Sequence, residues 1–132
     1  MNHTICYISK AKEGITDLEI QEIFATTQSK NNSENIKGIL LYDFGNFFQV
    51  LEGEKKIIED LYLNKISEDK RHSDILTIIN YHIKEPIFNN YSSDFNIVKT
   101  KTQLERINTY LGQKNLHHLS TNIQRMLTPF LL

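Results

Sequence analysis

The sequence predicts an α+β fold in which two helices cover one face of a β-sheet. Three observations support this prediction. Short runs rich in β-branched and aromatic residues alternate with two segments whose apolar residues recur at helical spacing. The elements follow the order strand, helix, strand, strand, helix, strand, strand. The chain has 132 residues, of which 39% are hydrophobic and 23% charged, values typical of a globular domain with a core.

The first part of the chain is predicted to form a strand followed by a helix. Residues 5–9 (ICYIS) are β-branched and aromatic, which favours a strand. Thr16 is a suitable N-cap, and apolar residues at helical spacing continue to about Ser29, so this segment is predicted to be an amphipathic helix. Residues 31–35 (NNSEN) are predicted to form a polar loop after it.

The centre of the chain, residues 38–53, is predicted to be a β-hairpin. Two apolar runs flank residues 43–46, where Gly45 and Asn46 tolerate the positive φ of a tight turn. Strand alternation places Gln49 on one face together with two large hydrophobic residues. Burying an amide without a partner costs roughly 1 to 3 kcal/mol. Gln49 therefore requires a cross-strand partner, an exposed edge position or a ligand.

The second half of the core is predicted to add one helix and two strands. Residues 54–67 carry apolar residues at helical spacing, and residues 75–83 form the longest β-type run, which ends before Pro86. A short last strand is predicted over residues 94–98. This order fits the ferredoxin-like arrangement, a βαββαββ sandwich with a five-stranded mixed sheet and both helices on one face.

The chain is predicted to divide at about residue 98. Residues 1–98 form the α+β domain, and residues 99–132 form an extension of two short helices broken at Gly112. The simplest use of this extension is to cover the free face of the sheet, and a contact between protomers is the next. We expect a homo-oligomer, because short chains of this kind have exposed apolar helix faces to cover.

Charge and cysteine content indicate which partners and which cellular compartment to expect. With 15 basic and 16 acidic side chains, the chain shows no charge excess of the kind that attracts nucleic acid or an anionic membrane. The single cysteine, Cys6, lies in an apolar run, so we expect a buried thiol and a reducing compartment. No signal peptide is visible, and no apolar run approaches the roughly 20 residues that span a bilayer. A soluble, cytoplasmic protein is expected.

Familiar enzymatic motifs are missing from the sequence, which has no glycine-rich phosphate loop, zinc-ligand spacing or nucleophile elbow. Asp69 and His72 could form an acid and base pair, although capping and surface charge are the commoner roles of such a turn. The other candidates are neutral polar residues. Tyr7, Asn31 and Gln49 are suited to reading the edge of a planar heterocycle. Tyrosine can also give up an electron and a proton, which favours a redox cofactor over hydrolysis.

These residues resemble those of the BLUF domain, a flavin-binding sensor of blue light, over about residues 5–98. The matching segments, in chain order, are residues 7–9, the segment at Asn31, residues 38–42, residues 48–53, residues 66–69 with Arg71-His72, and Phe88 with Tyr91-Ser92. Each segment is common alone, but their order and spacing together are specific to the family.

The resemblance implies an FAD whose isoalloxazine ring lies between the two helices. By the family pattern Tyr7 donates an electron and a proton, and Gln49 lies between Tyr7 and the flavin. Asn31 would bond the C4 carbonyl or the N3 side, and Asp69 with His72 would lie near the pyrimidine edge or close the pocket. The cofactor-binding residues that the resemblance implies are Tyr7, Ser9, Ile23, Thr27, Asn31, Phe48, Gln49, Leu51, Lys65, Asp69, Arg71 and His72.

The chain departs from the family pattern at several places. Thr27 stands where a serine is common, and Lys37 where a threonine is common. Tyr91-Ser92-Ser93, the segment implied in signalling, stands where the family usually has Trp, Ser and Met. One extra residue lies between Gln49 and Asp69, near residues 63–65, and Lys65 is our choice for the basic residue that faces the flavin.

Three hypotheses follow from the sequence. The first is a stand-alone blue-light sensor, not an enzyme, whose output is an unidentified partner protein. The second is a flavin-free interaction module that has kept the fold and lost the pocket. The third is a small acid and base enzyme that uses Asp69 and His72.

Overall fold

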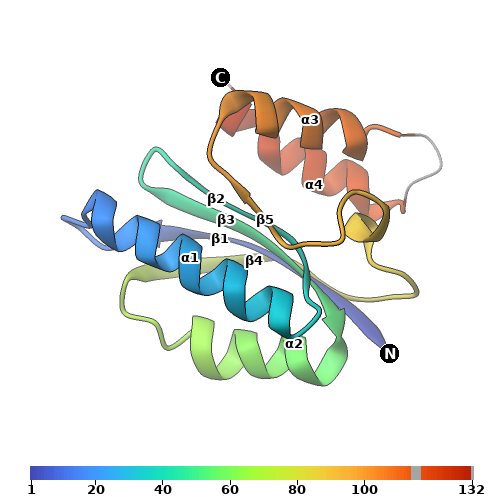
Figure 1. Ribbon diagram of the computed structural model, residues 1–132, viewed down its shortest axis with the longest axis horizontal. Helices are drawn as coiled ribbons and strands as arrows, with labels where there is room; N and C mark the ends of the chain where they lie inside the picture. The colour runs from blue at the N-terminus through green and yellow to red at the C-terminus, as the bar shows by residue number, and fades with distance from the viewer. Residues whose placement is uncertain (114–116, 132) are drawn as a thin grey trace. The chain divides into compact units, whose positions relative to one another are not determined.

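The computed structural model describes residues 1–113 and 117–131. The chain forms two compact units, Met1–Ile97 and Val98–Leu132 (Figure 1). No helix in the described part of the chain is both long and apolar enough to cross a membrane.

A five-stranded mixed sheet forms the centre of the first unit, with the strand order β4-β1-β3-β2-β5 (Figure 1). The strands are β1 (Asn2–Ala11), β2 (Lys37–Asp43), β3 (Asn46–Glu54), β4 (His72–Ile83) and β5 (Asn96–Val98). β1 pairs antiparallel with β3 and β4, and β2 pairs antiparallel with β3. β1 and β4 are longer than the predicted residues 5–9 and 75–83, because ladder hydrogen bonds also recruit residues with polar side chains.

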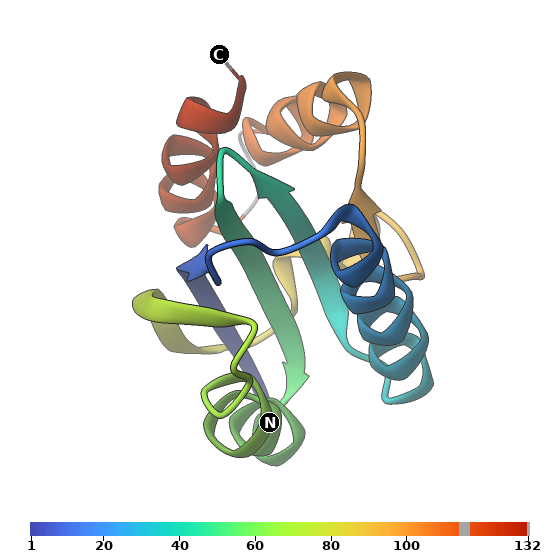
Figure 2. The same cartoon turned by 90° about the vertical axis from the view of Figure 1, so that its left-hand side faces the viewer.

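Two helices pack on one face of this sheet, as predicted. They are α1 (Asp17–Ser33) and α2 (Lys55–Leu61), seen from two directions in Figure 1 and Figure 2. The core between helices and sheet consists of Ile5, Tyr7, Ala11, Ile20, Phe24, Ile36, Leu40, Phe47, Leu51, Ile58, Leu61, Tyr62, Phe95 and Ile97. The predicted burial of the thiol is confirmed, because Cys6 is fully buried and burial raises its pKa.

The predicted loop at residues 31–35 is wrong in its first half, because α1 continues to Ser33. Thr16 starts the helix with the capping box that it forms with Glu19. Tertiary contacts extend the other end. The Asn31 side chain is buried, and Asn32 Oδ1 accepts a hydrogen bond of 2.6 Å from the backbone N–H of Phe95. Local propensity, which favours turns at asparagine, is overridden by these contacts.

The hairpin forms where predicted, but its turn differs in detail. Positive φ falls on Phe44 and Gly45 rather than on Gly45 and Asn46. Asn46 instead uses its side-chain amide to donate to the carbonyl of Phe44 at 3.1 Å, while Asp43 Oδ1 accepts from the Phe44 N–H at 3.0 Å. Two such side-chain bonds stabilise the strained residue between them.

The predicted helix over residues 54–67 is divided into two kinds of turn. Glu54 is the N-cap, α2 ends at Leu61, and a π-helical turn, η1, follows over Tyr62–Ile66. In this turn the Ser67 N–H donates to the carbonyl of Tyr62 at 3.0 Å, five residues back. A π-turn accommodates one residue more than an α-turn. Residues 63–65, where the family pattern suggests one extra residue, lie in this turn.

The second unit contains the two predicted helices, α3 (Lys101–Leu111) and α4 (Leu119–Leu127), followed by the short 3-10 helix η3 (Thr128–Leu131). α3 starts with a capping box of Thr100 and Gln103 and ends at Gly112, the predicted break. Gln124 Nε2 donates to the carbonyl of Asn108 at 3.0 Å and ties the two helices together. Residues 114–116 of the predicted extension lie outside the described residues.

A buried carboxyl group fixes the connection between β4 and β5 to the sheet. Glu52 on β3 is 0% exposed and accepts hydrogen bonds from Thr4 Oγ1 at 2.7 Å and from the N–H groups of Ile87 and Phe88 at 2.9 Å. These two N–H groups begin the 3-10 helix η2 (Ile87–Asn90). Burial raises the pKa of Glu52, and the bonds from the two N–H groups oppose that shift.

We predict that Glu52→Ala lowers the free energy of unfolding by about 3 kcal/mol, because it leaves buried donors without an acceptor. Urea denaturation followed by circular dichroism measures the change. The control is Glu59→Ala, which removes an exposed carboxylate 3.8 Å from Lys55. It should change stability by less than about 0.5 kcal/mol. Similar losses for the two variants would contradict an anchoring role for Glu52.

Candidate functional site

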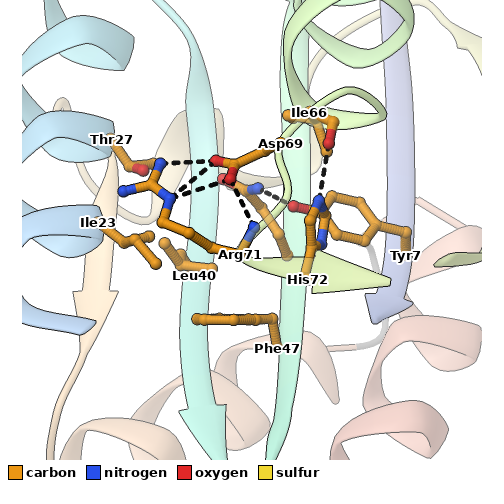
Figure 3. Close-up of a pocket in the computed structure, with 10 residues that line it drawn as sticks. Tyr7, Ile23, Thr27, Leu40, Phe47, Ile66, Asp69, Arg71 and His72 are labelled. Atoms are coloured by element: carbon orange, nitrogen blue, oxygen red, sulfur yellow. Dashed lines mark hydrogen bonds and ion pairs between the residues drawn. The ribbon is translucent and has the colours of Figure 1, made fainter. Parts of the chain in front are cut away.

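Two adjoining cavities lie on the helix-covered face of the sheet. Their volumes are about 70 Å³ and about 200 Å³. The smaller, shown in Figure 3, is lined by Tyr7, Ile23, Thr27, Leu40, Phe47, Gln49, Ile66, Asp69, Arg71 and His72. The larger is lined by Thr26, Thr27, Lys30, Asn31, Gln49, Leu61, Lys65, Ile66, Asp69 and Arg71. Half of each lining is shared, so the two cavities form one candidate site.

Tyr7 and Gln49 meet at the floor of the site. They are register partners on β1 and β3, which places both side chains on the same face of the sheet. Gln49 Nε2 donates to Tyr7 Oη at 2.5 Å, and the two residues are only 4% and 3% exposed. Burial raises the pKa of Tyr7, while the bond from Gln49 acts in the opposite direction. The phenol is therefore neutral and keeps its proton.

The cross-strand partner expected for Gln49 is thus present, but it satisfies only half of the amide. Within the described part of the chain, Gln49 Oε1 and Asn31 Nδ2 are buried and have no hydrogen-bond partner. An unsatisfied buried polar group costs about 1 to 3 kcal/mol. One free acceptor and one free donor line the same site, which fits a ligand with a polar edge, such as an isoalloxazine ring.

Asp69 and Arg71 form an ion pair at one side of the site (Figure 3). The Arg71 guanidinium donates to Asp69 Oδ1 at 2.9 Å from Nε and to Oδ2 at 2.6 Å from its terminal nitrogen. This contact holds the pKa of Asp69 below its usual range and raises the pKa of Arg71. The pair spans both cavities, because both residues line each of them.

His72 is held by two bonds that do not involve Asp69. Its Nδ1 lies 2.6 Å from Ser9 Oγ, and its Nε2 lies 2.7 Å from the carbonyl oxygen of Ile66. A carbonyl only accepts, so Nε2 is the donor to Ile66, and the Ser9 hydroxyl is the partner of Nδ1. The acid and base pair of Asp69 and His72 considered from the sequence is therefore not formed, because each side chain is committed to another partner.

Two lysines line the larger cavity together with Asp69, and the carboxylates of Glu34 and Asp60 are also close enough to act on both of them. Lys30 of α1 and Lys65 of the π-turn both line it, and the proximity of Lys65 lowers the pKa of Lys30. Among the described residues neither ammonium group forms an ion pair. Like charges held together attract an anion. The end of the site next to Asn31 is therefore suited to an anionic group of a ligand.

Most residues that the resemblance assigns to the cofactor line the two cavities. They are Tyr7, Ile23, Thr27, Asn31, Gln49, Lys65, Asp69, Arg71 and His72. Ser9 contacts the site through His72. Phe48 and Leu51 are not brought to the cavities. Successive residues of a strand point to opposite faces, so Phe48 lies on the opposite face from Gln49. Leu51 packs in the apolar core.

Sequence reasoning missed Thr26, Lys30, Leu40, Phe47, Leu61 and Ile66 as lining residues. Pairing in the hairpin could have found two of them. Leu40 is the register partner of Gln49, and Phe47 lies two residues before Gln49 on the same face. Helical spacing could have found Thr26 and Lys30, which lie three residues after Ile23 and Thr27 on α1. Ile66 had no comparable signal, because it lies in the π-turn, which shifts the helical spacing.

The segment Tyr91-Ser92-Ser93 lies outside the lining of both cavities. The Tyr91 ring packs edge-on against Phe88 with centroids 6.1 Å apart. The Ser93 carbonyl accepts a 2.5 Å bond from Lys37 Nζ at the start of β2. Tyr91 is thus connected to the sheet through the connection that Glu52 anchors.

Comparison with known proteins identifies the family. The model of the BLUF family, described as sensors of blue light using FAD, matches residues 3–94. The chain is 40% identical over 85 residues to photoactivated adenylate cyclase subunit alpha of Euglena gracilis, and 41% identical over 75 residues to the beta subunit of Euglena longa. These matches cover 64% and 57% of this chain but only 8% and 9% of the cyclase subunits.

Solved structures agree with this assignment. BlsA in its ground state is 30% identical, with a TM-score of 0.70, and the match covers 100% of this chain and 89% of BlsA. BlrP1 of Klebsiella pneumoniae, in complex with calcium and cyclic diGMP, is 26% identical with a TM-score of 0.78 over 99% of this chain and 34% of BlrP1. With its βαββαββ fold and its site between the two helices, the chain belongs to the BLUF family of flavin-using blue-light sensors.

Proposed function

We propose that this protein is a blue-light photoreceptor that binds FAD and uses Tyr7 and Gln49 as its switch. The observation that supports the proposal is the half-satisfied amide of Gln49. Its nitrogen is bonded to Tyr7, and its buried oxygen faces the site without a partner. A bound flavin would supply that partner, and Asn31 Nδ2 would donate to a flavin carbonyl.

The physical basis of the switch is that an amide and a phenol can pair in two ways. A phenol both donates and accepts, so Tyr7 can accept from the amide nitrogen of Gln49 or donate to its oxygen. Rotating the amide by half a turn therefore keeps the bond to Tyr7 and exchanges acceptor for donor on the side of the cavity. The two orientations differ in their bonds to a ligand, which makes the pair bistable.

Light would drive the exchange through Tyr7. A flavin excited by blue light is a strong electron acceptor. Because burial raises the pKa of Tyr7, the phenol is neutral and must release a proton together with the electron. Gln49, the hydrogen-bond partner of the phenol, lies where this proton leaves. When the electron and the proton return to Tyr7, the amide is left in its other orientation.

The output would be a change in affinity for a partner protein, because a switch acts only through states that bind differently. The curated relatives carry the name adenylate cyclase, and this chain spans less than a tenth of each. We propose that the corresponding partner here is a separate protein or a second copy of the chain, reached through Tyr91-Ser92-Ser93 or the C-terminal helices. The hydrogen bonds of Glu52 provide a connection from β3 to that segment.

Substitution of the switch residues tests the mechanism. Gln49→Leu and Tyr7→Phe should retain flavin, and hence a yellow colour, but lose the reversible shift of the absorption band to longer wavelength under blue light. Each removes one member of the hydrogen-bonded pair. Tyr91→Phe is the control and should retain the shift, because Tyr91 does not line the site. Absorption spectra before and after illumination measure the result, and a normal photocycle in Gln49→Leu would refute the proposed switch.

The two lysines at the larger cavity are proposed to bind the phosphate groups of the flavin nucleotide. Lys30→Met or Lys65→Met should weaken FAD and FMN binding by about threefold to fivefold each, a small effect because charges exposed to solvent are screened. Riboflavin, which lacks phosphate, should bind equally well to parent and variants. Fluorescence titration of flavin-free protein measures the affinities.

The matched control for this experiment is Lys56→Met, which removes an exposed lysine of α2 that lines neither cavity. It should leave all three affinities unchanged. The effect of the lysines should also decrease at high salt, because partly exposed charges are screened. Equal losses of riboflavin and FAD binding would argue against phosphate recognition.

A further inference from the structure

Two irregularities of the backbone lie on either side of Tyr7. The first is the π-helical turn Tyr62–Ile66, a type of distortion that is frequent at functional sites. The second is a bulge in β4. Cys6 pairs with Ile79 but Tyr7 pairs with Thr77, so Ile78 is the extra residue on β4. Bulges re-aim the side chains that follow them. Without this one, Ile78 rather than Thr77 would face Tyr7.

The two irregularities bring a second tyrosine onto Tyr7. The Tyr62 ring packs against the Tyr7 ring in a tilted arrangement, with centroids 5.6 Å apart and an angle of 51° between the planes. The Tyr62 hydroxyl is hydrogen-bonded to Thr77 Oγ1. Tyr62 is 8% exposed and belongs to the same apolar core as Tyr7. The Tyr62 ring therefore packs on the Tyr7 ring, with its backbone held by the π-turn and its hydroxyl held by β4.

This contact leaves Tyr7 little freedom. Gln49 bonds its hydroxyl, Tyr62 packs on its ring, and the His72 ring lies 6.1 Å away. A tilted aromatic pair prefers a narrow range of geometries. Rotation of the Gln49 amide breaks its hydrogen bond to the hydroxyl oxygen of Tyr7. The barrier to this rotation therefore depends on how firmly the Tyr7 ring is held.

We propose that Tyr62, held by Thr77, is a positioning residue that fixes the ring of Tyr7 against Gln49 and thereby sets the rate of return from the light-induced state. The proposal rests on the switch described above. It assigns to Tyr62 no electron transfer of its own. The bond to Thr77 is part of the device, because it determines the direction in which the Tyr62 ring points.

A double-mutant cycle tests this assignment. Tyr62→Phe and Thr77→Val remove the two ends of one hydrogen bond and keep the shapes of the side chains. Each should accelerate dark recovery by about tenfold, which corresponds to about 1.4 kcal/mol in activation free energy. The double variant should recover no faster than either single variant, because the same bond is lost in all three. The size of the light-induced band shift should stay the same, since Tyr7 and Gln49 are intact.

The control is Tyr42→Phe, since the Tyr42 ring packs on Phe47, 5.0 Å away, rather than on Tyr7. It should recover at the parental rate. The proposal would be overturned if Tyr62→Phe recovered at the parental rate. It would also be overturned if the effects of the two substitutions were additive in the double variant. A general loss of stability would not produce this pattern, because it would not make the two substitutions equivalent.

A measurement in the dark separates this inference from the proposed function. NMR of ring-labelled tyrosine in the flavin-bound protein reports the flip rate of the Tyr7 ring. The flips should be faster in Tyr62→Phe and in Thr77→Val than in the parent, and unchanged in Tyr42→Phe. If the parent shows no light-induced shift, the proposed function fails and this comparison alone decides the positioning role. Unchanged flip rates would overturn it.

Discussion

The hydrogen bond between Gln49 and Tyr7 is the interaction on which the site depends. An amide is placed among large hydrophobic residues, where it needs a partner, and the neighbouring strand supplies one phenol. That phenol satisfies the nitrogen and leaves the oxygen without a partner. A fold that satisfied the amide completely would be more stable, but it would have no place for a ligand. In the proposed function, this incomplete pairing would couple the sheet to the flavin.

The surrounding structure holds this pair in place and gives it a single open side. Strand register aligns Tyr7 with Gln49, while the bulge in β4 and the π-turn after α2 bring Thr77 and Tyr62 against the ring. The ion pair of Asp69 with Arg71 borders the open side. The amide of Gln49 thus has packed side chains on one side and an unsatisfied oxygen on the other.

The two faces of β3 carry the two buried polar residues Gln49 and Glu52. Gln49 lies on the face covered by α1 and α2, whereas Glu52 lies on the opposite face and holds the start of η2. Both residues belong to one strand, so β3 connects the cavity side of the sheet with the segment that precedes Tyr91. In the proposed function, Glu52 would offer a route for the signal that does not depend on Ser93.

The sequence by itself determined the element order, the sheet face of Gln49 and the family, because period-two alternation and motif spacing are local properties of the chain. Only the tertiary structure decided that Asn31 is helical and that His72 bonds to Ser9 instead of pairing with Asp69. These outcomes depend on contacts between residues far apart in the sequence, and such contacts override local propensity. The site of Tyr62 depends on a π-turn and a β-bulge, which no local pattern specifies.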